Sequence, residues 1–324
     1  MGMVQYDVAI IGAGPGGYSA ALKLAQLGKK TVLIENHKLG GECLNYGCIP
    51  SKTIISTSNL FNKISNFNEQ GIECDNLSIN LPKFQLWKDS IIKKLNNGIE
   101  ILCKNYNVTI MFGTASIKTK NVIQINLNNQ ITEISTDNII IATGTQPKEL
   151  ENLQFDQELI VSSKEMLETK TIPSSVLVVG GGAIGLELGT AFAKIGSKVT
   201  IVEITDSLLP GIDKDLVNVV KRSLVNLNAE VFFHAKILHV EKNSTKIRII
   251  IESNEKKFEK TFDKILVSIG RIPNTKNLGL ETVGINTDDN GFIDVDKNMM
   301  SNIPGIYAIG DITGPPWLAH KASN

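Results

Sequence analysis

Residues 4–17, VQYDVAIIGAGPGG, join a short apolar strand to a glycine-rich turn. The strand occupies residues 4–11, and Gly12, Gly14 and Gly17 follow it at GxGxxG spacing, where a helix is expected to begin. Gly12 and Gly14 permit a tight turn and let backbone N–H groups approach a pyrophosphate, while Gly17 allows close packing of the helix on the strand. The stretch predicts the start of a dinucleotide-binding domain built on a parallel sheet.

The next strand completes this fingerprint. It runs from Thr31 to Ile34 and ends at Glu35, where an acidic side chain would bind a ribose hydroxyl. A glycine turn without a ligand is the alternative for GxGxxG alone, but strand, turn, helix, strand and acid occur here in the required order. The N-terminal domain is therefore predicted to bind a dinucleotide.

A second copy of the fingerprint, VVGGGAIG, lies in the middle of the chain. Its glycines are Gly180, Gly182 and Gly185, a helix follows, and the next strand ends at Glu203. Glu203 matches the acid that accepts from a ribose 2′-hydroxyl, and residues 204–209 contain no Arg that would neutralise a 2′-phosphate. The second site is predicted to bind NAD rather than NADP.

Two cysteines lie between the fingerprints, in GECLNYGCIPSK at residues 41–52. Pro50 suits the first turn of a helix, so Cys48 is expected near the positive end of a helix dipole, which favours a reactive thiolate. Taken alone, Cys43 and Cys48 could be structural, part of a metal site or a redox pair. The two nucleotide sites that flank them in sequence favour the redox pair.

Composition excludes several functional classes. The 324 residues suggest two or three domains, and 33 basic residues balance 33 acidic ones, so no net charge attracts nucleic acid or an anionic membrane. No apolar run is long enough to span a bilayer, and Asp7 in the first strand argues against a signal peptide. We expect a cytoplasmic protein that binds neither nucleic acid nor membrane.

A zinc site is not expected. The four cysteines form only one close pair, and in a reducing compartment such a pair indicates redox or metal chemistry more than a structural disulfide. Metal binding would require a second pair or histidines at ligand spacing. The histidines are instead scattered, at His37, His234, His239 and His320.

Helical periodicity is clear over residues 82–105. We expect this helix to pack against the one that follows Cys48. The apolar face is predicted to carry Trp87, Ile91, Leu95, Ile99 and Leu102, with Lys88, Lys93 and Lys94 on the other side.

Strand patterns follow this helix. Short alternating segments over 108–134 predict a small antiparallel sheet with a turn at Asn128 and Asn129. A separate strand, 138–141, then runs into ATG at residues 142–144, where a strand returns to the ligand crevice.

The second half copies this arrangement. A helix over 213–227, a parallel strand over 230–233 and a β-meander over 237–262 precede a buried strand over 265–269 that meets Gly270. The fold class is therefore α/β, with two Rossmann-like domains, each a parallel sheet with helices plus a β-meander.

A short strand over 305–309 comes last and leads into Gly310 and Asp311. A carboxylate at the carboxyl end of a strand is well placed to bind polyol hydroxyls at the crevice. The alternative is an ordinary cap or turn aspartate.

The sequence resembles the pyridine nucleotide-disulfide oxidoreductases, which are flavoprotein disulfide reductases with two dinucleotide sites, over essentially all of its length. Within that family it is most similar to the dihydrolipoamide dehydrogenases. The pieces that carry the resemblance are GG at 40–41, CLN at 43–45, GCIPSK at 47–52, ATG at 142–144, GRIPNT at 270–275, GD at 310–311 and LAHKA at 318–322.

The resemblance implies three parts in the chain. Residues 1–148 would bind FAD and carry the redox cysteine helix, 149–272 would bind NAD, and 273–324 would return to complete the FAD site. A dithiol would attack the disulfide at Cys43, leaving Cys48 as a thiolate beside the flavin, and hydride would leave to NAD.

The same resemblance implies the site residues. Lys52 would lie near the flavin N5 with Glu187 as its partner, against the alternative that both are solvated helix charges. The implied FAD contacts are Gly12, Gly14, Gly16, Gly17, Glu35, Gly41, Lys52, Ala115, Thr143, Gly144, Asp311 and Ala319. The implied NAD contacts are Gly180, Gly182, Ile184, Gly185, Glu203 and Gly270.

Two departures from the family are visible. The family continues beyond the LAHKA segment into a C-terminal domain that forms the homodimer and carries a His-Glu acid/base pair, whereas this chain stops at Asn324, so we expect a fragment or shortened product with doubtful full activity. His320 lies on a flavin-side pattern and is not that base. Glu42 stands where the family commonly has Thr, and its negative charge next to Cys43 is expected to make that thiol less acidic.

The expected partner is the lipoyl domain of a 2-oxo acid dehydrogenase or glycine cleavage complex. Two other functions remain open. One is another disulfide or metal reductase on the same scaffold, such as a mercuric reductase. The other is a non-catalytic FAD- and NAD-binding module that interacts with acyltransferase complexes.

Overall fold

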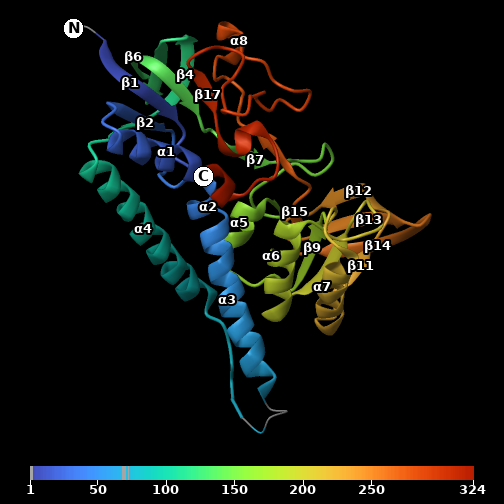
Figure 1. Ribbon diagram of the computed structural model, residues 1–324. Helices are drawn as coiled ribbons and strands as arrows, with labels where there is room; N and C mark the ends of the chain where they lie inside the picture. Colours follow the sequence, from blue (N-terminus) through green and yellow to red (C-terminus); the bar gives the residue numbers. More distant parts are fainter. Residues whose placement is uncertain (1–2, 68–70, 72) are drawn as a thin grey trace. The chain divides into compact units, whose positions relative to one another are not determined.

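The computed structural model describes residues 3–67, 71 and 73–324 (Figure 1). The chain forms two compact units, neither of which is continuous in sequence. The first unit comprises Met1–Cys48, Ile91–Gln146 and Arg271–Asn324, and the second comprises Ile49–Ser90 and Pro147–Gly270. Residues 49–90 thus group with the second unit, although they lie inside the range predicted to bind FAD.

The first unit is built on a sheet of order β3-β2-β1-β6-β5-β4, with β17 paired to β6. Strands β1, β2, β3, β6 and β17 pair in parallel, as a dinucleotide-binding domain requires. The strands are β1 (Val4–Ile11), β2 (Thr31–Glu35), β3 (Thr109–Phe112), β4 (Thr114–Thr119), β5 (Val122–Leu127), β6 (Gln130–Ile141) and β17 (Ile306–Ala308). The short strands β7 (Thr145–Pro147) and β16 (Arg271–Pro273) form a separate pair.

The helices that begin in or belong to the first unit are α1 (Pro15–Gln26), α2 (Gly41–Asn45), α3 (Cys48–Ser65), α8 (Leu280–Val283), the 3₁₀ helix η2 (Gly310–Thr313) and α9 (Ala319–Ser323). The predicted strand at 4–11, the helix after it and the strand ending at Glu35 are all confirmed. Helix α3 continues into the second unit after Cys48, and α4 (Leu81–Asn105) crosses from the second unit to the first after Ser90.

Strand β6 corrects the predicted antiparallel segment. The prediction separated an antiparallel sheet from a final strand at 138–141, but Gln130–Ile141 is one strand. It pairs antiparallel with β5 at its start and parallel with β1 along Ile134–Ile141, because two neighbours of opposite direction flank it. Strand β3 is parallel to β2 and was wrongly included among the antiparallel strands. The turn at Asn128 and Asn129 is confirmed, since both residues have positive φ.

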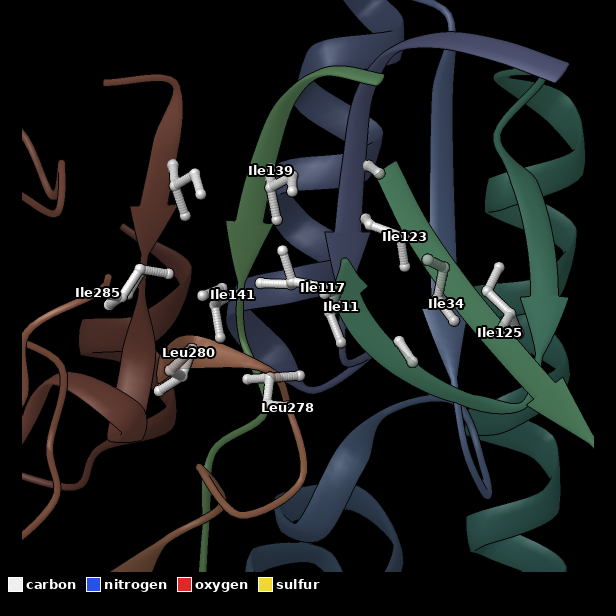
Figure 2. Close-up of a cluster of buried hydrophobic side chains, with 14 of the residues drawn as sticks. Ile11, Ile34, Ile117, Ile123, Ile125, Ile139, Ile141, Leu278, Leu280 and Ile285 are labelled. Carbon is white, nitrogen blue, oxygen red and sulfur yellow. The ribbon is translucent and has the colours of Figure 1, made fainter. Parts of the chain in front are cut away.

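Both faces of the first sheet are buried. Ile10 and Leu33 point to a cluster that includes Ile99 and Cys103 of α4, and the alternate residues point to the other face. Figure 2 shows that second cluster, with side chains from the sheet meeting the segment at 278–285. Its labelled members are Ile11, Ile34, Ile117, Ile123, Ile125, Ile139, Ile141, Leu278, Leu280 and Ile285. Burying one such side chain contributes about 1.5–3 kcal/mol, so this cluster anchors the C-terminal segment to the sheet.

The buried face of α4 differs from the predicted one. Trp87, Leu95 and Leu102 are exposed by 40% or more, so the predicted apolar stripe is wrong at these three positions. Ile99 is buried, and Lys93 and Lys94 are exposed, as predicted. Lys88, predicted to lie opposite the apolar face, is buried, and its Nζ donates to the carbonyl oxygen of Leu167 at 3.2 Å. The residues that are buried are Leu81, Phe84, Gln85, Lys88, Ile92, Ile99 and Cys103. The N-terminal part of α4 shares a buried cluster with Ile54 of α3, as expected for neighbouring helices.

The second unit has a parallel sheet of order β11-β10-β9-β15-β8 and an antiparallel meander, β12-β13-β14. The strands are β8 (Ile160–Val161), β9 (Ser175–Val179), β10 (Lys198–Val202), β11 (Glu230–Phe232), β12 (Ala235–Lys242), β13 (Ile247–Ser253), β14 (Lys256–Phe262) and β15 (Lys264–Val267). The helices are α5 (Ser163–Leu167), α6 (Ala183–Lys194) and α7 (Lys214–Asn226). The predicted strand–turn–helix repeat, the 213–227 helix and the meander are confirmed.

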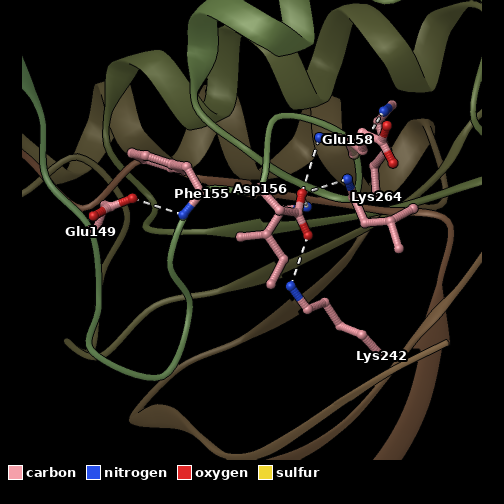
Figure 3. Close-up of polar contacts among 8 residues, drawn as sticks. Glu149, Phe155, Asp156, Glu158, Lys242 and Lys264 are labelled. Carbon is pink, nitrogen blue, oxygen red and sulfur yellow. Dashed lines mark hydrogen bonds and ion pairs between the residues drawn. The ribbon is translucent and has the colours of Figure 1, made fainter. Parts of the chain in front are cut away.

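The turn before β8, which the sequence did not predict, is fixed by hydrogen bonds to the carboxylate of Asp156 (Figure 3). Asp156 Oδ1 accepts from the backbone N–H groups of Glu158, Leu159 and Ile160 at 2.8–3.0 Å, and Oδ2 accepts from Lys242 Nζ at 2.9 Å. Partial burial would raise the pKa of Asp156, but these hydrogen bonds outweigh it and lower that pKa to about 2. The carboxylate therefore fixes the start of the β8 edge.

Among the described helices, none is long and apolar enough to cross a membrane.

Candidate functional site

The first glycine turn lies where β1 meets α1. Gly12 has a φ of +101°, and a Cβ there would lie 2.4 Å from the carbonyl oxygen of Ala142. A Cβ at Gly17 would lie 1.8 Å from the carbonyl oxygen of Gly12. Both positions therefore require glycine, as the predicted pyrophosphate turn does.

Glu35 lies against this turn. Its side chain is buried, with Oε2 accepting from the N–H of Ala13 at 2.8 Å and Oε1 accepting from the N–H of His37 at 2.8 Å. The carboxylate is thus fixed at the carboxyl end of β2, beside the glycine turn. Its position fits the predicted ribose contact, because oxygens of a fixed carboxylate can also accept from sugar hydroxyls.

The second turn repeats this geometry in the second unit. A Cβ at Gly180 would lie 2.5 Å from the carbonyl oxygen of Ser268. Glu203 Oε2 accepts from the N–H of Gly181 at 2.7 Å, and Oε1 accepts from the N–H of Thr205 at 2.9 Å. Each acid therefore accepts from the middle residue of its turn and from the residue two positions after itself.

The remaining predicted NAD residues are Gly182, Ile184 and Gly185 at this second turn and Gly270 after β15. Gly185 packs closely on it, since a Cβ there would lie 2.5 Å from the carbonyl oxygen of Gly180. Gly182 and Gly270 have open space at the Cβ position, and Ile184 is 40% exposed in the first turn of α6. Their contact with a nucleotide stays a prediction.

The cysteine segment packs directly on the first glycine turn. A Cβ at Gly41 would lie 2.5 Å from Cα of Gly14, and the N–H of Gly40 donates to the carbonyl oxygen of Ala13 at 2.8 Å. Helix α2, which carries Cys43, therefore begins at the predicted pyrophosphate turn.

Asn45 holds α2 in place. Its buried Nδ2 donates to the carbonyl oxygens of Leu39 and Gly41, both at 2.8 Å, and its Oδ1 accepts from Asn96 Nδ2 at 2.9 Å. Sequence analysis did not assign Asn45 a role, although it lies inside the CLN segment.

The chain then turns back so that Cys48 follows close to Cys43. A Cβ at Gly47 would lie 3.2 Å from the carbonyl oxygen of Glu42 and 3.4 Å from Cα of Cys43. Cys48 is the first residue of the 18-residue helix α3, so its predicted place at a helix N-terminus is confirmed. The first turn of α3 contains no acidic residue. Cys43 is half-buried and Cys48 is exposed.

The expected effect of Glu42 on the acidity of Cys43 stays a prediction, but Glu42 has a partner that the sequence did not indicate. Its carboxylate forms an ion pair with Arg271 Nη2, and the side chain of Arg271 is only 9% exposed. The residue next to Cys43 in the sequence therefore carries a negative charge that is paired with a largely buried positive one. Sequence reasoning missed this pair because Arg271 lies 229 positions further along the chain.

Hydrogen bonds with Asn274 and Asp311 fix the ATG turn at 142–144 and the residue after it. Asn274 Nδ2 donates to the carbonyl oxygen of Thr143 at 2.8 Å, and the N–H of Asn274 donates to that of Gly144 at 3.0 Å. Thr145 Oγ1 donates to Asp311 Oδ2 at 3.1 Å. The Asp311 side chain does not cap η2, which removes the cap alternative, and its contact with a polyol stays a prediction.

The C-terminal helix is seated by small residues. A Cβ at Gly16 would lie 2.9 Å from the carbonyl oxygen of Ala322, and a Cβ at Gly310 would lie 3.2 Å from Cβ of Ala322. Ala319, which is half-buried, thus begins a helix packed on the start of α1. Ala115 is a buried core residue of β4 instead, and its FAD contact stays a prediction.

Lys52 and Glu187 meet in the second unit. Lys52 Nζ donates to both carboxylate oxygens of Glu187 at 2.8 Å, so the predicted pairing is confirmed. Their side chains are 61% and 40% exposed. An exposed pair contributes about 1 kcal/mol or less to stability, so the alternative of two solvated helix charges stays open.

No group of three or more His, Cys, Asp or Glu side chains that could hold a metal ion occurs in the part of the chain that the structure describes.

Comparisons with known proteins agree with this geometry. The chain is 40% identical over 320 residues to the dihydrolipoyl dehydrogenase of Geobacillus stearothermophilus and 40% identical over 321 residues to that of Bacillus subtilis. Each match covers 99% of this chain and 68% of the relative. Among solved structures, the Cu(II) complex of the HOCl-induced flavoprotein disulfide reductase RclA from Escherichia coli aligns with a TM-score of 0.86 at 25% identity, covering 99% of this chain and 69% of that one.

The family model described as pyridine nucleotide-disulphide oxidoreductase matches residues 6–324. FAD and NAD(H) are the cofactors of this family, in agreement with the two glycine turns. The chain belongs to the pyridine nucleotide-disulphide oxidoreductase family.

Proposed function

We propose that the chain carries the electron-transfer half of a dihydrolipoyl dehydrogenase, oxidising protein-bound dihydrolipoamide and passing hydride to NAD. One observation supports this most directly: the Cys43–Cys48 segment is packed on the first glycine turn, with Cys48 at the N-terminus of α3. A thiol at that position is stabilised as a thiolate, which is the form that takes part in thiol–disulfide exchange.

The chemistry at sulfur follows from thiol–disulfide exchange. One thiolate of the substrate attacks Cys43 Sγ of the Cys43–Cys48 disulfide, forming a mixed disulfide and releasing Cys48 as a thiolate. The second substrate thiolate attacks the substrate sulfur of the mixed disulfide, which closes the lipoyl disulfide and releases Cys43. Two electrons and the corresponding protons have then left the substrate.

The residues of the first unit fit FAD. The N–H groups of Gly12 and Ala13 donate within the protein, so those at the start of α1 would bind a pyrophosphate. Glu35 would offer a fixed carboxylate to a ribose, and Asp311 would offer one to polyol hydroxyls. When bound, FAD supplies the electron relay between the cysteine pair and NAD.

Lys52 follows Cys48 by four residues, which places both side chains on one face of α3. We assign Lys52 the role of presenting a positive charge on the flavin side of the helix, with Glu187 fixing its ammonium group.

The second unit fits NAD. Glu203 would repel the 2′-phosphate of NADP if it binds the ribose as proposed, and residues 204–209 provide no Arg to offset that repulsion. We therefore propose NAD as the hydride acceptor, with the lipoyl domain of a 2-oxo acid dehydrogenase or glycine cleavage complex as the partner. A homodimer is expected for the longer relatives. The cytoplasm is the proposed compartment, because a close cysteine pair acts in redox chemistry there.

A second candidate is a disulfide or metal reductase with another substrate. The structural likeness to RclA supports it, since that protein is a flavoprotein disulfide reductase solved with Cu(II). The 40% identity to dihydrolipoyl dehydrogenases exceeds the 25% identity to RclA, which favours the first candidate. A non-catalytic FAD- and NAD-binding module is the third.

The test is the visible spectrum of the purified chain, titrated anaerobically with NADH. We expect flavin absorption, bleaching on reduction and a long-wavelength thiolate-to-flavin band. Cys48→Ser should remove that band while NADH still reduces the flavin. Bound flavin without the band in the unmodified protein would overturn the proposal.

Substrate identity is decided by a second assay. Dihydrolipoamide, a Hg(II) salt with NADH and a Cu(II) salt with NADH are compared at equal enzyme concentration. The proposal expects turnover of dihydrolipoamide to exceed both metal reactions, and the reverse order would favour the metal reductase. Absence of any turnover, in a chain with bound FAD, would favour the non-catalytic module.

A further inference from the structure

Arg271 joins two segments of the first unit that are distant in sequence. Its guanidinium, only 9% exposed, is paired with Glu42 through Nη2. The same guanidinium donates from Nε to Thr145 Oγ1 at 2.6 Å and from Nη2 to the carbonyl oxygen of Thr145 at 2.9 Å. One buried cation therefore holds both the helix that carries Cys43 and the strand β7.

The hydroxyl of Thr145 links Arg271 to Asp311. Because Thr145 Oγ1 accepts from Arg271 Nε, its own proton is directed away from the guanidinium and is donated to Asp311 Oδ2 at 3.1 Å. The result is a continuous chain from Glu42 through Arg271 and Thr145 to Asp311. Hydrogen bonds in such a chain strengthen one another.

Glu42 is the only carboxylate in the segment from Gly41 to Cys48. At the other end of that segment, Tyr46 contacts His37 Nδ1 through its hydroxyl at 2.6 Å, and Lys38 Nζ lies 5.7 Å from the centroid of the Tyr46 ring. Asn45 and Asn96, which fix α2, are neutral. Arg271 is thus the buried cation that faces the carboxylate adjacent to Cys43.

We propose that Arg271 is a positioning residue for the redox cysteines. It cancels the charge of Glu42 beside Cys43 and ties α2 to the segment that carries Asp311. The proposal rests on the proposed function only in taking Cys43 as the thiol that meets the substrate. A negative charge next to a thiol disfavours its thiolate, so the uncompensated Glu42 slows any reaction of Cys43 that proceeds through the thiolate.

The test measures thiol reactivity without NADH or substrate. The full chain is reduced with dithiothreitol, freed of reductant and treated with iodoacetamide at pH 7, and alkylation of Cys43 and Cys48 is followed separately by peptide mass spectrometry. In Arg271→Gln we expect Cys43 to react roughly three- to tenfold more slowly, and in Glu42→Gln more quickly by a similar factor. The double variant should return to within about twofold of the unmodified protein.

A purely structural role for Arg271 predicts a different pattern. Arg271→Gln would then change Cys43 reactivity in the same direction with or without Glu42→Gln, and that result would overturn the proposal. Arg248→Gln is the matched control, because Arg248 pairs with Glu259 and Glu241 at an exposed site of the second unit. It should leave Cys43 reactivity unchanged.

Glu42→Gln alone keeps the test decisive if Arg271→Gln does not fold. Unchanged or slower alkylation of Cys43 in a folded Glu42→Gln protein would overturn the proposal. Because the assay needs no flavin signal, a missing thiolate-to-flavin band contradicts the proposed function and leaves the thiol measurement intact.

Discussion

Thr143 and Asn274 hold each other through reciprocal hydrogen bonds: Asn274 Nδ2 donates to the carbonyl oxygen of Thr143 at 2.8 Å, and Thr143 Oγ1 donates to the carbonyl oxygen of Asn274 at 3.0 Å. The pair fixes the ATG turn beside the first glycine turn, where Ala142 closes against Gly12. The GRIPNT segment therefore helps to fix the first site, although it lies about 130 positions further along the chain than the ATG turn.

Asn274→Ala should loosen this turn. Losing the side-chain bond leaves the Thr143 carbonyl without that donor, which costs about 1–3 kcal/mol in the free energy of unfolding. We expect a lower urea midpoint and a smaller fraction of FAD retained after gel filtration. Thr143→Ser keeps the hydroxyl and should retain FAD normally; equal FAD loss in both variants would contradict this account.

Gly17→Ala should abolish the first nucleotide site. The added Cβ would lie 1.8 Å from the carbonyl oxygen of Gly12, so α1 or the turn must shift. We expect purified Gly17→Ala protein to show no visible flavin absorption, which means that it contains no FAD. Gly98→Ala is the control, because this α4 position has open space and Ala favours a helix by about 1 kcal/mol. FAD content should be unaffected there.

Asp156 should give the second unit an acid-sensitive component of stability. Its folded pKa of about 2 lies below the usual 3.8, so the stabilisation is complete above about pH 4 and is lost as pH falls through about 2. The shift corresponds to about 2 kcal/mol. Asp156→Asn should lower the free energy of unfolding at pH 7 by roughly that amount, as measured by urea denaturation. Between about pH 4 and pH 2, the free energy of unfolding of this variant should depend less on pH than that of the unmodified protein. An unchanged pH dependence would show that Lys242 and the three N–H groups do not favour the ionised form.

Lys52→Met should separate function from stability. The Lys52–Glu187 pair is exposed, so its loss should change the free energy of unfolding by less than about 1 kcal/mol. If Lys52 stabilises charge at the flavin, the rate of flavin reduction by NADH should fall by about tenfold or more. Lys236→Met removes a comparable pair with Glu252, at 2.9 Å in the same unit, and should change neither quantity. Equal reduction rates in both variants would leave Lys52 as a surface charge.

Local patterns predicted the two glycine turns. The requirement for glycine at Gly12 and Gly180 comes from distant residues, Ala142 and Ser268, but at the last glycine of each turn it comes from atoms a few residues away. Gly17 faces the carbonyl of Gly12, and Gly185 faces that of Gly180. The acids Glu35 and Glu203 were predictable for the same reason, since each binds its own turn.

Distant partners account for what sequence reasoning missed. Lys88 donates to the carbonyl oxygen of Leu167, and Arg271 contacts Glu42 and Thr145. These partners lie far apart in the sequence, so hydrophobic periodicity does not reveal them. The single strand β6 escaped prediction because its two halves pair in opposite senses with different neighbours.

The middle residue distinguishes the two glycine turns. Ala13 carries a methyl group in the first turn, whereas a Cβ at Gly181 would meet Leu208 Cδ2 at 2.6 Å and Glu203 Oε2 at 3.0 Å. Leu208 is fully buried, so it has little room to yield. The two turns are therefore not interchangeable, because the Ala of the first turn, placed at position 181, would bring its methyl group into Leu208 and Glu203. A chimera of the two halves would have to transfer the residues that cover each turn together with the turn itself.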